Sequence, residues 1–385
     1  MKKLCVLFTT SHSDTLGNAG RLEMVNYLSQ NFDTTILTNR KAFIQERFPH
    51  CAVIGYESQK NRYLPVIADI LESRKIAKCV KQIQSEFVFM IVDTAPVALW
   101  LKQPVFQYVH QYGQRSEYRS GFCRKKVRNI IGRINHAFIF KGLKKSKATF
   151  VVSRPIIEIL KNKGLQHLVH TPHGVELEKF RNPFVTDMHE PLRKLRAQGC
   201  FLVTYTGWVT ENRGFQLMLD SIRQAVGQDE KIVLVIAGAD NHYSQRITAY
   251  AQKHDLSQNI LDLGVIDAKL IPGILHYSDV CLSFLDDVPA YRISPPQKVV
   301  EYFAAGKPVL CNKIASHEWL VDHGKNGYIL APNPVDVGKA IWRLKNDKNL
   351  YDVMADNAFQ AAKKYDIDLI YGNMVNVIEK CLDEA

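Results

Sequence analysis

The sequence contains no uninterrupted apolar run of the roughly 18 residues that a membrane-spanning helix needs. Its first residues are basic and then apolar, but the apolar run ends at Phe8 and no small-residue cleavage site follows. We therefore expect a first strand at the N-terminus rather than a signal peptide, and a cytoplasmic protein.

Paired cysteines are also missing. The eight cysteines are widely scattered, with no C-x-x-C pair and no His-Cys cluster at zinc spacing, so we expect reduced, mostly buried thiols. Acidic residues are in deficit, because 38 Asp and Glu face 50 Lys and Arg, for a formal net charge of +12. Such a surface attracts anions, and charge alone leaves nucleic acid, anionic lipid and phosphorylated small molecules open.

The chain has 385 residues, more than one hydrophobic core usually organises, which predicts two domains. Short β-branched apolar runs alternate with helical segments, a pattern typical of parallel sheets built from βαβ units. In the first half these runs cover residues 4–10, 34–38, 87–93, 105–110 and 148–153. The pattern restarts at residues 201–207, 232–238, 260–264, 280–285 and 308–311.

The predicted fold class is therefore α/β, with two Rossmann-like, doubly wound domains. We place the first domain at residues 1–180 and the second at residues 181–365. The segment 176–199 contains two prolines and no strand-like run, and is interpreted as the connection between them. Apolar residues of the last segment, 366–385, fall near one face of a helix, and periodicity leaves open whether that helix returns to complete the first domain.

The most informative stretch is residues 294–309, S-P-P-Q-K-V-V-E-Y-F-A-A-G-K-P-V. Ser294 is a suitable N-cap, Pro295 suits the first helical position, and a Gly and a Pro end the helix before a strand. The amino end of such a helix favours a nucleoside diphosphate. Lys298 lies in its first turn and Glu301 one turn later, where a carboxylate can accept ribose hydroxyls. Alternatively, both side chains belong to an ordinary amphipathic helix and are merely solvated.

A second candidate is the glycine turn that follows the first strand of the second half. Gly207 ends that strand, and Arg213 stands just before a helix that begins near Phe215. A guanidinium there can make a bidentate contact to a leaving diphosphate. The alternative is a surface arginine in a loop.

These residues resemble a known family. The string S-P-P-Q-K-V-V-E-Y-F-A-A-G-K-P-V-L is similar to the donor-site signature of retaining GT-B glycosyltransferases of family 4, whose two domains face a cleft. Further matches stand in the same order along the second half. They are Gly207 with Arg213 and Gly214, residues 234–238, residues 263–265, residues 278–280, and Glu318 before Gly327 and Tyr328.

The resemblance implies a set of site residues. Those implied to bind the donor are Gly207, Gly264, Val265, Ser294, Pro295 and Glu301, and those implied to act in catalysis are Arg213, Lys298 and His110. In the first half the match is looser. The loop of Gly17, Gly20 and Arg21 corresponds to the one that approaches donor and acceptor, and residues 172–175 stand at an N-G-V-like turn. A lone histidine at a strand end, such as His110, is otherwise more often structural.

Two positions depart from the family pattern. The first glutamate of its E-x7-E motif falls on Ile293, and the arginine that often follows the glycine of the 207 turn is Trp208. Contacts to the donor hydroxyls and one phosphate contact therefore need other residues, for which Asp286 or Asp287 is a hypothesis.

The activity that the resemblance implies is transfer of a hexosyl group from a nucleotide diphosphate sugar to a glycan or a lipid-linked acceptor, with retention and without a metal or cofactor. No paired carboxylates stand at a spacing that nominates a nucleophile and an acid, so a front-face path is expected. The one D-x-D match, Asp366 to Asp368, precedes the last helix, where capping is the expected role.

Residues 115–147 hold eleven basic residues and one acidic residue, interleaved with apolar side chains. Basic and apolar residues at helical spacing suggest attachment to an anionic membrane surface, peripheral and on its inner face. Equally, the apolar face packs on its own domain and the lysines are solvated.

Two rival functions remain. A nucleic-acid binder would suit the positive charge, but no recognition-helix module, zinc finger or aromatic RNA-binding signature accompanies it. A sugar-nucleotide epimerase or an inactive nucleotide-sugar binder would keep the GT-B fold, and Ile293 is the best support for that rival.

Overall fold

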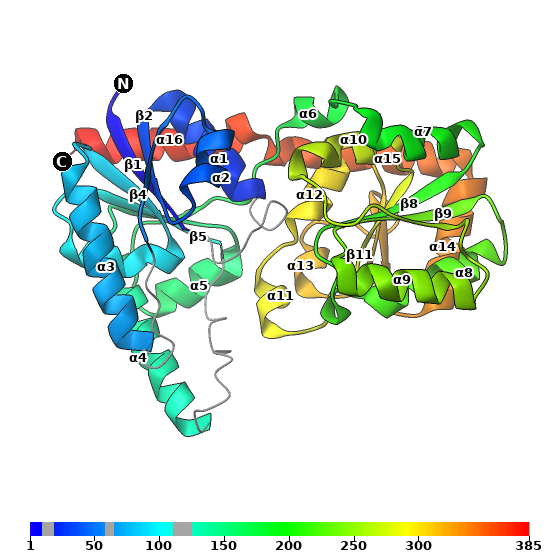
Figure 1. The fold of residues 1–385 in the computed structure, drawn as a ribbon, viewed down its shortest axis with the longest axis horizontal. Helices are drawn as coiled ribbons and strands as arrows, with labels where there is room; N and C mark the ends of the chain where they lie inside the picture. The colour runs from blue at the N-terminus through cyan, green and yellow to red at the C-terminus, as the bar shows by residue number, and fades with distance from the viewer. Residues whose placement is uncertain (10–18, 58–64, 111–124, 385) are drawn as a thin grey trace. The chain divides into compact units, whose positions relative to one another are not determined.

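The structure is a computed structural model that describes residues 1–9, 19–57, 65–110 and 125–384. The chain divides into two compact units (Figure 1). The first contains the N-terminal strand, residues 21–172 and the chain from Ile370 onward, and the second contains residues 173–369. From the sequence we place the end of the first domain at residue 180 and the start of the last segment at residue 366.

The first unit is built on a parallel sheet with the strand order β3-β2-β1-β4-β5-β6-β7. Its β1, β4, β5 and β6 strands are buried almost throughout, as expected where helices cover both faces of a parallel sheet. The strands are β1 (Lys3–Phe8), β2 (Asp33–Thr38), β3 (Ala52–Gly55), β4 (Phe87–Ile91), β5 (Val105–Val109), β6 (Ala148–Val151) and β7 (Leu168–His170).

The strands β3 and β7 were not predicted, because each is short and has few buried side chains. The helices of this unit are α1 (Ala19–Asn31), α2 (Lys41–Arg47), α3 (Pro65–Gln82), the 3-10 segment η2 (Val92–Trp100), α4 (Lys125–Leu143), α5 (Arg154–Asn162) and most of α16 (Ile367–Asp383).

The helix α16 packs on the first unit although it is the last element of the chain. It buries Tyr371, Met374, Val375 and Ile378, and the ring of Tyr371 lies 5.9 Å from that of Tyr27 in α1. The last helix therefore completes the first unit. The periodicity of its apolar residues alone had left its docking place open.

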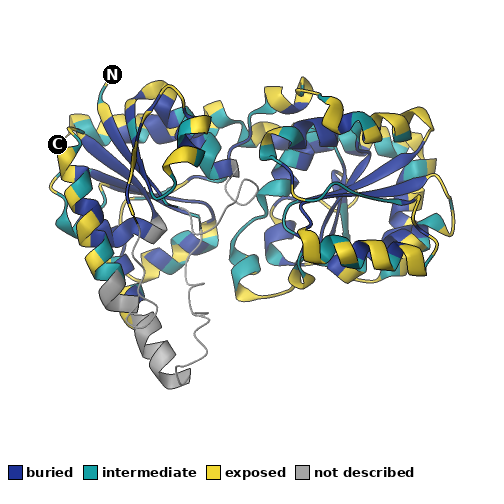
Figure 2. Cartoon of the chain, in the orientation of Figure 1, coloured by how far each residue is buried: buried dark blue, intermediate teal, exposed yellow. Residues whose placement is uncertain are grey.

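The second unit has a parallel sheet of order β10-β9-β8-β11-β12-β13. Figure 2 shows its strands buried between helices whose outer faces are exposed. The strands are β8 (Phe201–Thr206), β9 (Ile232–Ala237), β10 (Ile260–Asp262), β11 (Val280–Ser283), β12 (Val309–Asn312) and β13 (Gly327–Leu330). The helical segments that follow are η4 (Glu211–Arg213), α8 (Phe215–Val226), α9 (Asn241–Lys253), η5 (Ala268–Leu270), α10 (Ile271–Tyr277), α11 (Pro289–Ile293), α12 (Gln297–Ala304), α13 (Ala315–Glu318), α14 (Pro334–Asn346), α15 (Lys348–Ala362) and η6 (Lys363–Tyr365).

The connecting segment 176–199 is helical and belongs to the second unit. It forms α6 (Leu177–Arg181), η3 (Asp187–His189) and α7 (Glu190–Ala197). Phe180 and Leu192 insert into the core of that unit, and the buried ring of His189 contacts the Leu270 carbonyl at 3.1 Å. Periodicity missed these helices because each is at most eight residues long.

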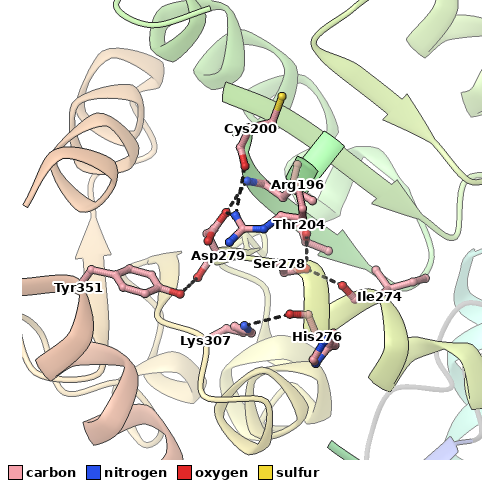
Figure 3. A network of polar contacts seen from close by, with 10 residues as sticks. Arg196, Cys200, Thr204, Ile274, His276, Ser278, Asp279, Lys307 and Tyr351 are labelled. Carbon is pink, nitrogen blue, oxygen red and sulfur yellow. Dashed lines mark hydrogen bonds and ion pairs between the residues drawn. The ribbon is translucent and has the colours of Figure 1, made fainter. Parts of the chain in front are cut away.

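A polar network ties α7 to the amino end of the second sheet (Figure 3). Arg196 pairs with Asp279 at 2.5 Å, and Asp279 also accepts the Leu202 N–H at 2.7 Å. Burial raises the pKa of Asp279, an effect opposed by the Leu202 N–H and by Arg196. Tyr351 of α15 donates to the Asp279 carbonyl at 3.2 Å. This network therefore holds helices onto the edge opposite to the carboxyl ends of the strands.

Candidate functional site

Three glycines line the carboxyl edge of the second sheet. Gly207, Gly238 and Gly264 follow β8, β9 and β10, with φ of +106°, +128° and +64°. The Gly207 N–H donates to the Ala237 carbonyl at 2.8 Å, and the Gly238 N–H donates to the Gly264 carbonyl at 2.7 Å. A Cβ at Gly238 would stand 2.2 Å from the Gly207 carbonyl oxygen. The edge is thus bare backbone, held at positive φ where a side chain would be strained.

The helix α12 begins at Gln297 with Pro296 as its N-cap, and not at Pro295 with Ser294 as cap. The reason is that a residue preceding proline is pushed out of the helical region, and both Ser294 and Pro295 precede one. Ser294 is instead the C-cap of α11, with extended backbone angles. No side chain caps the amino end of α12. An amino end of this kind is suited to an anion.

Lys298 extends from the first turn of α12 to the end of β8. Its Nζ lies 3.7 Å from the centroid of the Tyr205 ring, and a Cβ on Gly207 would be 3.3 Å from that Nζ. Burial and then the charge of Arg213 lower the pKa of Lys298 well below its usual value, with Glu301 opposing. An anion bound here would reverse that balance, because it favours the ammonium.

Glu301 is one turn further along α12. Burial raises its pKa to about 7, and the nearby Lys298 opposes that rise. A carboxyl group poised near neutrality is an unusual state for a surface glutamate and is typical of functional sites.

Arg213 closes η4 directly before Gly214, which caps α8 with φ of +72°. Burial lowers the pKa of Arg213, but hydrogen bonds and proximity to the hydroxyls of Tyr205 and Tyr291 outweigh burial and raise it overall. The guanidinium also lies 5.9 Å from the Tyr291 ring. The structure therefore gathers Arg213 and Lys298 around Tyr205, although 85 positions separate them in the sequence.

Gly264 and Val265 stand at the same edge, after β10. The Asp262 side chain accepts the Gly264 N–H at 2.9 Å, which fixes the turn. Val265 leaves 53% of its surface exposed, an uncovered apolar side chain beside polar backbone.

Asp287, which with Asp286 was the hypothesis for the missing first glutamate, is paired with Arg292. Arg292 holds that carboxylate through two hydrogen bonds, of 2.5 and 2.8 Å, and lowers its pKa. Tyr291 of α11 instead reaches the site, two positions before Ile293. Sequence reasoning missed Tyr205 and Tyr291, because neither residue is adjacent to Arg213 or Lys298 in the sequence.

The other candidates lie in the first half of the chain. Arg21, in the first turn of α1, has its guanidinium 6.0 Å from the ring of Phe8, which ends β1. His110 follows β5 and stacks on Tyr108, with ring centroids 6.5 Å apart. Gly20 precedes Arg21 in α1, whereas Gly17 lies outside the described residues.

The basic segment 115–147 is described in side-chain detail only from residue 134. There α4 buries Asn135, Ile139 and Leu143 and places Gly142 so that a Cβ would be 2.0 Å from the Ala95 carbonyl oxygen. This part of the apolar face packs on its own unit, and the lysines nearby are exposed. Among the described residues no helix has the length and apolar character to cross a membrane.

Among the described residues, no cluster of three or more His, Cys, Asp or Glu residues able to hold an ion occurs. The Asp366 carboxylate accepts the Asp368 N–H at 2.9 Å, a local turn contact. The seven cysteines of these ranges are free thiols.

The part of the chain that contains this site is similar to known proteins. The family profile "Glycosyl transferases group 1" matches residues 192–361, which contain Gly207, Arg213, Lys298 and Glu301. This stretch of the chain is similar to the group 1 glycosyl transferases. The sites drawn from sequence in the second unit therefore lie inside the matched stretch.

The chitobiosyldiphosphodolichol beta-mannosyltransferase of Debaryomyces hansenii is 26% identical over 171 residues, which make up 42% of this chain. The match spans only about a third of that relative, 36% of its length. This similarity concerns one stretch of each protein.

Solved structures resemble the whole chain. Anabaena Alr3699/HepE in complex with UDP has a TM-score of 0.74 at 15% identity, over 99% of this chain and 100% of that one. Sucrose-phosphate synthase from Thermosynechococcus elongatus has a TM-score of 0.74 at 16% identity, over 100% of both chains. The matched stretch thus lies in one half of a GT-B fold, which confirms the fold class predicted from the sequence.

Proposed function

We propose that the protein transfers a hexosyl group from a nucleotide diphosphate sugar to a glycan or lipid-linked acceptor, with retention of the anomeric configuration. The observation that carries the proposal is the convergence of Arg213, Lys298 and the uncapped amino end of α12 beside the bare Gly207 turn. Two basic side chains and the amino end of a helix beside a glycine turn suit a pyrophosphate.

The donor would bind through the residues of this edge. The diphosphate lies against α12 and Arg213, and ionised Glu301 accepts the ribose hydroxyls. Val265 and the Gly264 turn offer an apolar side chain and backbone polar groups to the base. UDP is present in the Anabaena HepE structure, which supports a nucleoside diphosphate of this class.

Catalysis follows from the charge that develops as the diphosphate leaves. Preorganised cations lower the barrier because their attraction grows with that charge. Arg213 and Lys298 supply it without a metal or cofactor, and a front-face path needs no carboxylate nucleophile. For the acceptor we propose roles for Gly17, Gly20 and Arg21, and for the transferred sugar a role for His110, as the family resemblance implies.

The decisive assay offers a panel of nucleotide sugars and measures released nucleoside diphosphate with and without glycan and lipid-linked acceptors. Acceptor-dependent release supports the proposal, and NMR coupling at the new anomeric carbon tests retention. Unchanged turnover in EDTA is expected for a metal-independent enzyme. Conversion of the donor sugar without glycoside formation would instead reveal an epimerase, and binding without either reaction an inert nucleotide-sugar binder.

A further inference from the structure

The ladder between β8 and β11 opens before either strand ends. Val203 and Thr204 pair with Val280 and Cys281, and the pairing stops there although β8 continues to Thr206. A buried phenol occupies the opening. The Tyr302 hydroxyl accepts the Thr206 N–H at 2.9 Å and the Thr206 hydroxyl at 3.1 Å, and donates to the Leu282 carbonyl at 3.4 Å.

The opening lies at the point where the order of the sheet reverses. From β8 the chain proceeds outward through β9 and β10 on one side, whereas β11, β12 and β13 extend on the other. In doubly wound sheets ligands bind at this switch point, outside the carboxyl ends of the strands. Tyr302 therefore splays the two strands where the nucleotide would enter.

The Tyr302 side chain also links the Gly207 turn to α12. Tyr302 and Lys298 are one turn apart on α12 and share a face, because residues four apart are neighbours on a helix. That face meets three successive residues at the end of β8. Lys298 covers the Tyr205 ring, Tyr302 holds Thr206, and Gly207 leaves the space that the Lys298 ammonium fills.

We propose that Tyr302 is a positioning residue, whose hydroxyl sets the distance between the Gly207 turn and Lys298 that stabilisation of the departing diphosphate requires. The inference rests on the proposed function. Removing the hydroxyl leaves the buried N–H and hydroxyl of Thr206 without their acceptor, so the strand end must shift to find another. A small shift matters because catalytic contacts depend steeply on geometry.

The test is Tyr302→Phe, with kcat and donor KM measured separately and active sites counted by nucleotide titration. We expect kcat per active site to fall by about tenfold to a hundredfold, while donor KM changes less than about threefold, since contacts that strengthen only in the transition state are weakened. A merely structural tyrosine would lower the melting temperature and the number of active sites, and would leave kcat per site unchanged. That outcome overturns the inference.

Tyr351→Phe is the matched control. It removes another tyrosine hydroxyl from the same unit, but one that donates to Asp279 at the opposite end of the sheet (Figure 3). Its kcat should stay at the wild-type value. At the partner residue, Thr206→Ser keeps the hydroxyl and should retain activity, whereas Thr206→Val should lower kcat. Adding Thr206→Val to Tyr302→Phe should cost less than the two single effects combined, because the residues act together.

Failure of the proposed function has a different signature. Wild-type protein that releases no diphosphate from any donor would remove the transferase proposal. The positioning role is then decided by amide exchange at Gly207 and Val209, whose N–H groups bond to Ala237 and Gly238 rather than to Tyr302. Faster exchange of both in Tyr302→Phe supports it, and unchanged exchange overturns it.

Discussion

At the scale of single residues, burial shifts the pKa values of two ionisable side chains in the site. Burial lowers the pKa of Lys298 and raises that of Glu301 to about 7, so burial disfavours the charged form of both side chains. Arg213 remains a permanent cation between two phenols. An anion bound beside Lys298 would favour its ammonium form.

Arg213→Ala tests the permanent cation. We expect turnover to fall by about two to three orders of magnitude, as is typical when one preorganised charge contact to a developing anion is lost. The measurement is diphosphate release at saturating donor. Arg223→Ala, an exposed arginine on α8 of the same unit, is the control and should behave as wild type. Near-native turnover in folded Arg213→Ala would remove Arg213 from the mechanism.

Glu301→Gln tests the raised pKa through stability. Because the folded pKa of about 7 exceeds the ordinary 4.5, ionised Glu301 destabilises the fold, fully above pH 7 and progressively less as pH falls to 4.5. The free energy of unfolding of the variant should therefore exceed that of wild type by about 3 kcal/mol at pH 8 and should match it near pH 4.5. Denaturant titrations at both pH values measure this.

The same substitution should weaken donor binding. Calorimetry at pH 8 with a nucleoside diphosphate is expected to show lower affinity in Glu301→Gln, because an amide accepts ribose hydroxyls less strongly than a carboxylate. Equal affinity would argue against the ribose contact, while the stability result would stand.

At the scale of elements, the carboxyl edge of the second sheet needs glycine where a side chain would collide with neighbouring backbone atoms. Gly238→Ala places a Cβ 2.2 Å from the Gly207 oxygen at φ +128°, so it should cost about 3 to 5 kcal/mol of stability and disturb the nucleotide edge. Gly199→Ala is the matched control, because φ is +75° there and nothing lies within 4 Å. It should cost only about 1 kcal/mol. Similar losses in the two variants would refute the crowding argument.

The sequence predicted long buried strands well, since each is an apolar run whose burial on both faces leaves little choice of structure. It also located α12, but placed its start too early because the effect of one proline on the residue before it was left out. The role of Tyr302 could not be predicted from the sequence. Its role depends on where β8 and β11 separate, and that separation is set by strand register between elements about 75 residues apart.

At the scale of the whole molecule, the two units should respond separately to a ligand. Tyr371→Ala removes a fully buried ring from the first unit, and should cost that unit about 3 to 5 kcal/mol. A nucleoside diphosphate should instead stabilise the second unit by mass action. Calorimetric melting with and without UDP checks both, and a UDP-induced shift confined to the transition that Tyr371→Ala lowers would contradict the assignment.

The charge of the whole chain supports a test of membrane attachment. Exposed lysines near the end of α4, including Lys144 and Lys145, add to the field of a chain with net charge +12. We expect flotation with vesicles rich in phosphatidylserine at low salt, and loss of flotation at high salt. Lys144→Glu with Lys145→Glu should weaken it. A protein that stays at the bottom of the gradient at low salt would exclude the peripheral reading.

The placement of α16 also governs the order of events during synthesis. Residues 173–369 make up nearly all of the second unit, whereas the first unit needs α16 as well as residues 21–172. The core of the first unit is complete only once Tyr371, Met374 and Ile378 have been translated. Although most of the first unit is translated before the second, its packing therefore cannot be completed until α16 has been made.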